Sequence, residues 1–216
     1  MQRLFGNQQG VTLIEQLVAA LLGLVMIGGL CGFYRDQLFY NLAQQTKTAT
    51  LEDARGALDI MARDLKNAGS WATGAPPAET GAADDPESDA DGLCNRVYAA
   101  APGLLHVQMD LNGNNNCADS DPRENVRYEL AGPTATCPGS ITIRRNGDCL
   151  AANITTPAAG KLFSYFDNAG VDLGDTPPRA AIKRVRIAFA VVAKHPDPRV
   201  SGSVATELST SVELRN

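Results

Sequence analysis

The sequence has only two histidines, His106 and His195, and only 6% aromatic residues. Two histidines are too few for a histidine-rich metal centre, and the absence of Cys-x-x-Cys-His excludes the usual c-type haem attachment. The sequence also lacks Gly-x-Ser-x-Gly, His-Glu-x-x-His and a phosphate-binding glycine loop. We therefore expect no enzyme, no catalytic residue and no cofactor. The net charge of −5 argues against nucleic acid as a partner.

One long apolar run lies near the N-terminus. Leu17–Leu30 reads LVAALLGLVMIGGL, and the run extends over 24 residues when it is counted from Val11 to Tyr34. A membrane-spanning helix needs about 20 apolar residues. An ordinary secretory signal is not indicated, because the start carries only Arg3 and the run passes directly into a polar helical pattern. The sequence therefore predicts one membrane-spanning helix.

Glu15 lies near the start of this span. A carboxylate inside a membrane span is costly and is by default a functional hypothesis. The alternative is a glutamate that reaches the lipid headgroups from the end of a helix. The residues alone leave both interpretations open.

Gly10-Val11-Thr12-Leu13-Ile14-Glu15, followed by an apolar helix, resembles the type IV prepilin signal. The resemblance implies that a prepilin peptidase cuts between Gly10 and Val11, that the new amine is methylated, and that Glu15 is the glutamate retained by the family. Val11 departs from the usual Phe or Met. In an apolar assembly a carboxylate needs a cationic partner, and the resemblance implies that Glu15 meets the Val11 amine of a neighbouring subunit.

The helical pattern continues well beyond the membrane span. An apolar stripe recurs at alternating spacings of three and four, which indicates one buried helical face; its members are Leu51, Ala54, Leu58, Met61, Leu65 and Ala68. Gly69 supplies a C-terminal cap, and there is no proline before Pro76. We expect one helix over 11–68, about 85 Å long at 1.5 Å per residue, whose segment 11–34 spans the membrane or enters a filament core.

A β-rich domain is expected over 69–216. Segment 74–92 is rich in Ala, Pro and acidic residues and predicts a long mobile loop. Strands are expected at 104–109, 126–130, 141–145, 161–166, 182–192 and 204–214. Asn146-Gly147 is a hairpin turn signal. One helix followed by short antiparallel strands is an α+β layout, and the resemblance implies a type IV pilin-like fold with the helix packed on an antiparallel sheet.

Three stretches narrow the resemblance to PilW-type minor pilins. They are Arg55–Gly69, the region from Ile141 to Ile187, and the closing Val212–Asn216. The resemblance covers both ends and the middle of the chain, but not segment 74–92 or the insert around 112–121. It implies a role in twitching motility, cell adhesion or DNA uptake, between which the sequence does not choose.

Four cysteines lie in the outer part: Cys94, Cys117, Cys137 and Cys149. In an exported, loop-rich domain they indicate two disulfides with three possible connectivities. We favour the pairs adjacent in sequence, Cys94–Cys117 and Cys137–Cys149. Cys31, at the end of the span, is expected to be free. The spacing Cys-x-x-Cys, typical of zinc sites, does not occur.

Two further patterns each have a purely structural and a functional interpretation. Asp110, Asn112 and Asn114 alternate as the oxygen ligands of calcium loops do, but the match is poor and an Asn-rich turn is the alternative. The basic residues gather at a few strand positions: Arg144, Arg145, Lys183, Arg184 and Arg186. A DNA contact is conceivable, yet the solvent face of an antiparallel sheet explains the pattern without one.

Three functions are therefore compared. The first is a minor pilin that helps initiate or cap a type IV pilus, with other minor pilins, the major pilin and the inner-membrane assembly platform as partners. The second is a minor pseudopilin of a type II secretion system. The third is a membrane-anchored periplasmic binding protein without a filament role. The first two place the chain in the bacterial inner membrane, single-pass, with its C-terminal domain periplasmic; the pilin would then reach the cell surface.

Overall fold

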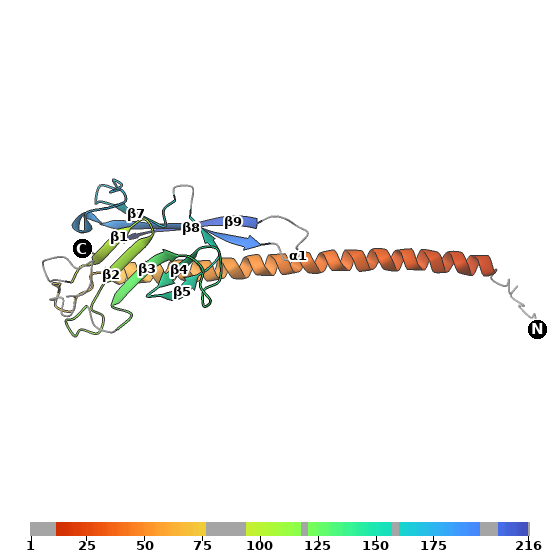
Figure 1. Cartoon of the computed structure of the whole chain (residues 1–216), viewed down its shortest axis with the longest axis horizontal. Helices are drawn as coiled ribbons and strands as arrows, with labels where there is room; N and C mark the ends of the chain where they lie inside the picture. The colour runs from red at the N-terminus through yellow and green to blue at the C-terminus, as the bar shows by residue number, and fades with distance from the viewer. Residues whose placement is uncertain (1–11, 77–93, 118–120, 157–159, 195–202, 216) are drawn as a thin grey trace, which may run out of the picture.

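The computed structural model describes residues 12–76, 94–117, 121–156, 160–194 and 203–215. The expected leader 1–10, Val11 and most of the expected loop 74–92 lie outside these residues. One helix, α1 (Leu13–Asn67), dominates the shape of the described chain (Figure 1). It begins at the N-cap Thr12, and Gly69, with a φ of 74°, follows its C-cap Ala68. The helix is 55 residues long, or about 82 Å.

The two halves of α1 have different surroundings. From Leu13 to Ala49 nearly every residue is exposed, and this half projects away from the strands (Figure 1). The second half buries a stripe on its inner face, at Ala54, Ala57, Leu58, Met61, Leu65 and Ala68. All but Ala57 belong to the apolar stripe expected from the sequence, and Leu51 is half-buried. The helix therefore carries an unpacked apolar segment and a packed segment on a single axis.

The first sheet is an antiparallel meander of five strands in chain order. Its strands are β1 (Val97–Ala101), β2 (Leu104–Gln108), β3 (Asn125–Ala131), β4 (Thr142–Arg145) and β5 (Asp148–Ala151). β4 and β5 form the expected hairpin, with positive φ at Asn146 and Gly147. β1 and β5 were not predicted, because neither segment has a regular apolar alternation.

The second sheet is built around the long strand β8. Its strands are β6 (Ile154–Thr155), β7 (Phe163–Phe166), β8 (Arg184–Lys194) and β9 (Ser203–Glu213). β7 and β6 pair with successive parts of one edge of β8, and β9 pairs with the other edge over its whole length. A short 3₁₀ helix, Arg179–Ala181, precedes β8.

The expectation of one antiparallel sheet was therefore wrong, although the α+β layout of a long helix on antiparallel strands is confirmed. The division occurs between β5 and β6, where Asn153 has a φ of 54°. Asn153 thus adopts the left-handed conformation at the point where the chain leaves the first sheet, and β6 then pairs with β8. No sequence pattern marks that change.

Both sheets and the helix share one core. Met61 and Leu65 of α1 are fully buried in the same cluster as Tyr128 of the first sheet and Phe189 of the second. The two sheets are also tied by a side chain, because the Tyr165 hydroxyl lies 2.8 Å from the carbonyl oxygen of Ala101 and 2.9 Å from that of Leu104. The β-rich part therefore packs as one unit on the second half of α1.

Candidate functional site

Glu15 lies exposed in the first turn of α1. Its backbone N–H donates to Oγ1 of Thr12 at 3.3 Å, so Thr12 is the helix N-cap and Glu15 is at position N3. Thr-x-x-Glu is the spacing of a capping box, and a negative charge at this position also suits the helix dipole. Glu15 thus has a local structural role beside the assembly role expected from the resemblance. The expected cleavage residues Gly10 and Val11 lie outside the described residues.

The exposed half of α1 is a candidate membrane anchor. It is the one helix among the described residues that is long and apolar enough to cross a membrane, and none of its most apolar 18-residue window is buried. Large apolar side chains such as Leu24, Met26 and Leu30 are each at least two-thirds exposed. Such a surface requires lipid or another apolar partner.

A charged junction joins the packed half of α1 to the first sheet. One Asp64 oxygen, Oδ2, accepts a hydrogen bond from the Tyr128 hydroxyl at 2.6 Å and from Nε of Arg145 at 2.9 Å. The Asp64 and Arg145 side chains are 15% and 23% exposed, so this ion pair is largely withdrawn from solvent. The expectation that Arg145 lies on a solvent face was wrong, because its guanidinium turns toward the helix.

The two partners of Asp64 respond to it electrostatically. Burial, together with the charge and hydrogen bond of Asp64, raises the pKa of the Tyr128 hydroxyl well above its usual value. Burial would lower the pKa of the Arg145 guanidinium, but the hydrogen bond and charge of Asp64 outweigh it, and the pKa is raised. Asp64, Tyr128 and Arg145 therefore form one coupled polar cluster (the Asp64 cluster) at the helix–sheet interface.

The remaining basic residues do not gather in one place. Arg144 lies on β4 and donates from Nη2 to the Gly132 carbonyl at 2.8 Å. Arg184 and Arg186 lie on β8, and Arg184 pairs with Glu213 at 2.9 Å. The concentration seen in the sequence is thus divided between two sheets.

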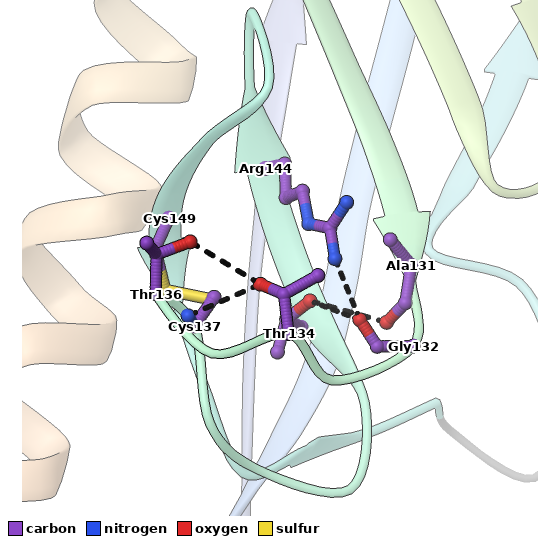
Figure 2. Close-up of a disulfide and its surroundings, with 8 residues drawn as sticks. Ala131, Gly132, Thr134, Thr136, Cys137, Arg144 and Cys149 are labelled. Carbon is purple, nitrogen blue, oxygen red and sulfur yellow. Dashed lines mark hydrogen bonds between the residues drawn. A yellow bond between two sulfur atoms is a disulfide. The ribbon is translucent and has the colours of Figure 1, made fainter.

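The two disulfides have the pairing favoured from the sequence. Cys94–Cys117 links the start of the described domain to the loop after β2, with the Cα atoms 6.1 Å apart. Cys137–Cys149 links the β3–β4 loop to β5, with the Cα atoms 5.3 Å apart. Figure 2 shows the second bond beside α1, with Thr134 accepting a hydrogen bond from the backbone N–H of Cys137. Cys31 is free and exposed.

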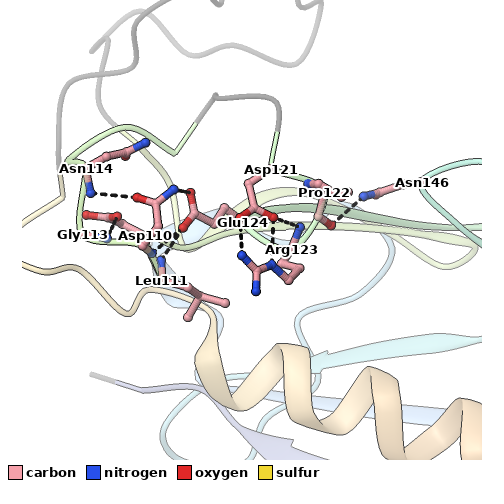
Figure 3. Close-up of polar contacts among 10 residues, drawn as sticks. Asp110, Leu111, Gly113, Asn114, Asp121, Pro122, Arg123, Glu124 and Asn146 are labelled. Carbon is pink, nitrogen blue, oxygen red and sulfur yellow. Dashed lines mark hydrogen bonds and ion pairs between the residues drawn. The ribbon is translucent and has the colours of Figure 1, made fainter.

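The Asn-rich loop is organised by its own backbone. Asp110 accepts from the N–H groups of Gly113 and Asn115, and Asn112 and Asn114 each accept from the N–H group two residues on. The carboxylate of the buried Glu124 accepts hydrogen bonds from the backbone N–H groups of Leu111 and Asn112 (Figure 3). The three oxygens expected for calcium are therefore engaged in turns, and the structure adds no support for a metal there. Among the described residues, no three His, Cys, Asp or Glu side chains group as metal ligands do.

The turn before β3 is fastened to the tip of the β4–β5 hairpin. Hydrogen bonds from Arg123 lower the pKa of Asp121 to about 2 and hold the turn before β3. Asn146, at the hairpin tip, donates from Nδ2 to the carbonyl group of Pro122 (Figure 3) and to that of Asn125. Its Oδ1 accepts a hydrogen bond from the backbone N–H of Arg127. The hairpin signal in the sequence therefore also supplies a long-range fastening, which sequence reasoning missed.

The chain was also compared with protein-family models, with curated proteins and with solved structures, and none of the three comparisons finds a match.

Proposed function

We propose that this chain is a minor pilin that helps initiate or cap a type IV pilus and acts through protein–protein interfaces. The prepilin-like sequence around Gly10 and Glu15 supports processing by a prepilin peptidase. On this proposal the chain is first a single-pass inner-membrane protein with a periplasmic domain, and later a filament subunit beside other pilins. The two disulfides suit an oxidising compartment outside the cytoplasm.

One observation carries the proposal. The same uninterrupted helix holds a bare apolar half and a half that is packed into a folded domain. An ordinary anchor needs only the span and a linker, whereas here the helix fixes the domain rigidly relative to the apolar segment. A rigid connection of this kind suits a subunit whose helix enters a helical bundle at a set depth while its domain meets neighbours outside.

Processing is the direct test. The mature chain from its native host should begin at Val11, and the new amine of Val11 should carry a methyl group. Mass spectrometry of the N-terminal peptide would show both. Gly10→Phe should retain the leader, because a bulky side chain occupies the position at the cut. Gly6→Phe places the same side chain elsewhere in the leader and should leave cleavage intact. An unprocessed wild-type chain would favour a plain membrane-anchored protein and overturn the proposal.

Glu15 tests assembly separately from insertion. Glu15→Ala should still insert and still be cut, yet be depleted from sheared filaments, because it loses the charge that pairs with a neighbour's amine in an apolar interior. Glu15→Gln keeps the capping-box shape and should be depleted nearly as much. Gln16→Ala is the matched control and should assemble normally. Normal recovery of both Glu15 variants would show that the carboxylate is not used, and rescue by Gln alone would assign Glu15 to helix capping.

A further inference from the structure

One edge of the second sheet, the outer edge of β9, pairs with no described strand. β9 pairs with β8 through eleven consecutive residue pairs, from Arg184 opposite Glu213 to Lys194 opposite Ser203. Within the described part of the chain, no strand pairs with the other edge of β9. A strand of 11 residues is about twice the usual length. The open edge is therefore long enough to bind another strand.

The hydrogen-bond ladder between β8 and β9 determines which backbone N–H and C=O groups of β9 point toward the outer edge. The N–H of Leu214 donates to the carbonyl of Lys183 at 2.8 Å, so that pair is hydrogen-bonded. Hydrogen-bonded pairs alternate in an antiparallel ladder, which directs the even-numbered residues of β9 toward β8. The hydrogen bonds of β8 are consistent with this assignment, because the N–H groups of its even-numbered residues Ala188 and Val192 donate to carbonyl groups on the side away from β9. The outward N–H and C=O groups are those of Ala205, Glu207, Ser209 and Ser211.

β9 lacks three of the usual protections against strand addition. Proteins generally guard such an edge with lysine, proline or a bulge. β9 reads SVATELSTSVE, which contains no lysine and no proline, and its register with β8 is unbroken. The outward-directed residues include small side chains at Ala205, Ser209 and Ser211, all exposed. Side chains of a strand stand roughly perpendicular to the sheet, so those of β9 do not block a partner backbone that approaches in the plane of the sheet.

The helix offers a supporting surface beside the edge. Asp64 faces β4, and Asp53 and Ile60 line a cavity of about 500 Å³ on the β5 and β6 side of α1. At 100° per residue, Leu51 and Ala62 fall on the opposite flank of the buried stripe, which is the β9 side. Both are half-buried apolar side chains. Inward side chains of an added strand would cover them and so add apolar burial to backbone pairing.

We propose that β9 is a strand-addition site for an extended segment of a different polypeptide, which carries a Lys or Arg opposite Glu207. The charge of the edge selects this occupant. Glu207 is the charged residue among the outward ones, and the other glutamate of β9, Glu213, is paired with Arg184. A second copy is disfavoured, since parallel pairing places each glutamate beside its equivalent. Antiparallel pairing in full overlap leaves the two Glu207 side chains diagonal, at roughly 7–8 Å.

Site-specific cross-linking in the native host, with the full-length chain, tests the proposal. A photoreactive amino acid replaces one residue at a time at Ala205, Glu207, Ser209 or Ser211. Strand pairing predicts that the cross-linked partner residues step by two along one extended segment of one partner, which peptide sequencing would identify. A contact through side chains alone would give no such steps. Scattered products, no product, or cross-links to a second copy of this chain would overturn the proposal.

Two variants test the backbone pairing and the charge separately. Ser209→Pro removes one outward N–H without touching the β8 ladder, and it should reduce cross-linking from position 207 about tenfold; Ser209→Ala keeps the N–H and should not. Glu207→Arg leaves every backbone group in place and should reduce cross-linking from position 211 about fivefold by repelling the basic residue. Unchanged yields in both variants would refute strand addition.

This inference does not require the pilus. The cross-linking pattern is measured whether or not the leader is cut after Gly10, and whether or not Glu15 is needed for assembly. A stepped pattern in a chain that keeps its leader would sustain the strand-addition site and refute the proposed function. A cleaved chain without stepped products would do the reverse.

Discussion

The Asp64 cluster should determine how firmly the domain is held on the helix. Asp64→Ala leaves the Arg145 guanidinium and the Tyr128 hydroxyl at a largely buried interface without their carboxylate. Removing one partner of a buried ion pair costs about 3–5 kcal/mol. The pair here is 15% and 23% exposed on its two sides, so water recovers part of that cost. We therefore expect a loss of about 3 kcal/mol in the free energy of unfolding, or about 6–12 °C in Tm for a domain of this size.

Equilibrium unfolding of the full chain in detergent, with the disulfides intact, measures this loss. The single tryptophan, Trp71, lies just beyond the helix and reports the transition by fluorescence. Asp59→Ala, at an exposed position of the same helix, is the control and should change stability by less than about 0.5 kcal/mol. The double variant Asp64→Ala/Arg145→Met should recover about 1–2 kcal/mol, since it also removes the stranded charge. A single variant as stable as the control would refute the reasoning.

Three further outcomes can be measured in the same way. Reducing Cys94–Cys117, which closes a separation of 23 residues, should cost about 3.4 kcal/mol, and reducing Cys137–Cys149, which closes 12, about 2.8 kcal/mol by chain entropy; Cys→Ser pairs measured one at a time check the order. Stability should fall as pH rises above about 10, because a folded-state pKa of Tyr128 above the unfolded value favours folding only while the phenol stays protonated in both states. Burial also raises the pKa of the Tyr165 hydroxyl, so Tyr128→Phe should reduce that alkaline loss without abolishing it, and an unchanged slope would contradict the prediction. Asn146→Ala should cost about 0.5–1.5 kcal/mol, the net value of an ordinary hydrogen bond, because the N–H and C=O groups it leaves in the β3 region are exposed and can bind water.

The elements with strong local signals could be predicted from the sequence. The helix, its stripe and its glycine end follow from period and capping, and β8 follows from alternating Val185, Ile187 and Phe189, all of which are buried. The two disulfide pairs followed from proximity in sequence. In each of these cases the residues that determine the structure lie within about two dozen positions of one another.

The features that escaped prediction depend on distant partners. Asp64 is one polar residue between the buried Met61 and Leu65, and nothing nearby shows that Tyr128 and Arg145, 64 and 81 residues away, will reach it. The separation into two sheets coincides with one left-handed residue, Asn153, whose side chain tolerates that conformation without demanding it. The pattern at Asp110, Asn112 and Asn114 allowed two interpretations from sequence, because Asn and Asp residues at alternate positions suit calcium ligands and equally build successive turns.

The alignment of β8 and β9 with the axis of α1 (Figure 1) determines how the molecule would respond to tension. A pull on the domain against a fixed N-terminal helix runs nearly parallel to these strands. Such a force loads the eleven residue pairs between β8 and β9 and the helix–sheet contacts in shear. These contacts must then break together. A pull across the strands would instead open them one pair at a time. The geometry therefore makes the long axis the mechanically strong direction of this protein, and single-molecule stretching along and across that axis should give unequal rupture forces.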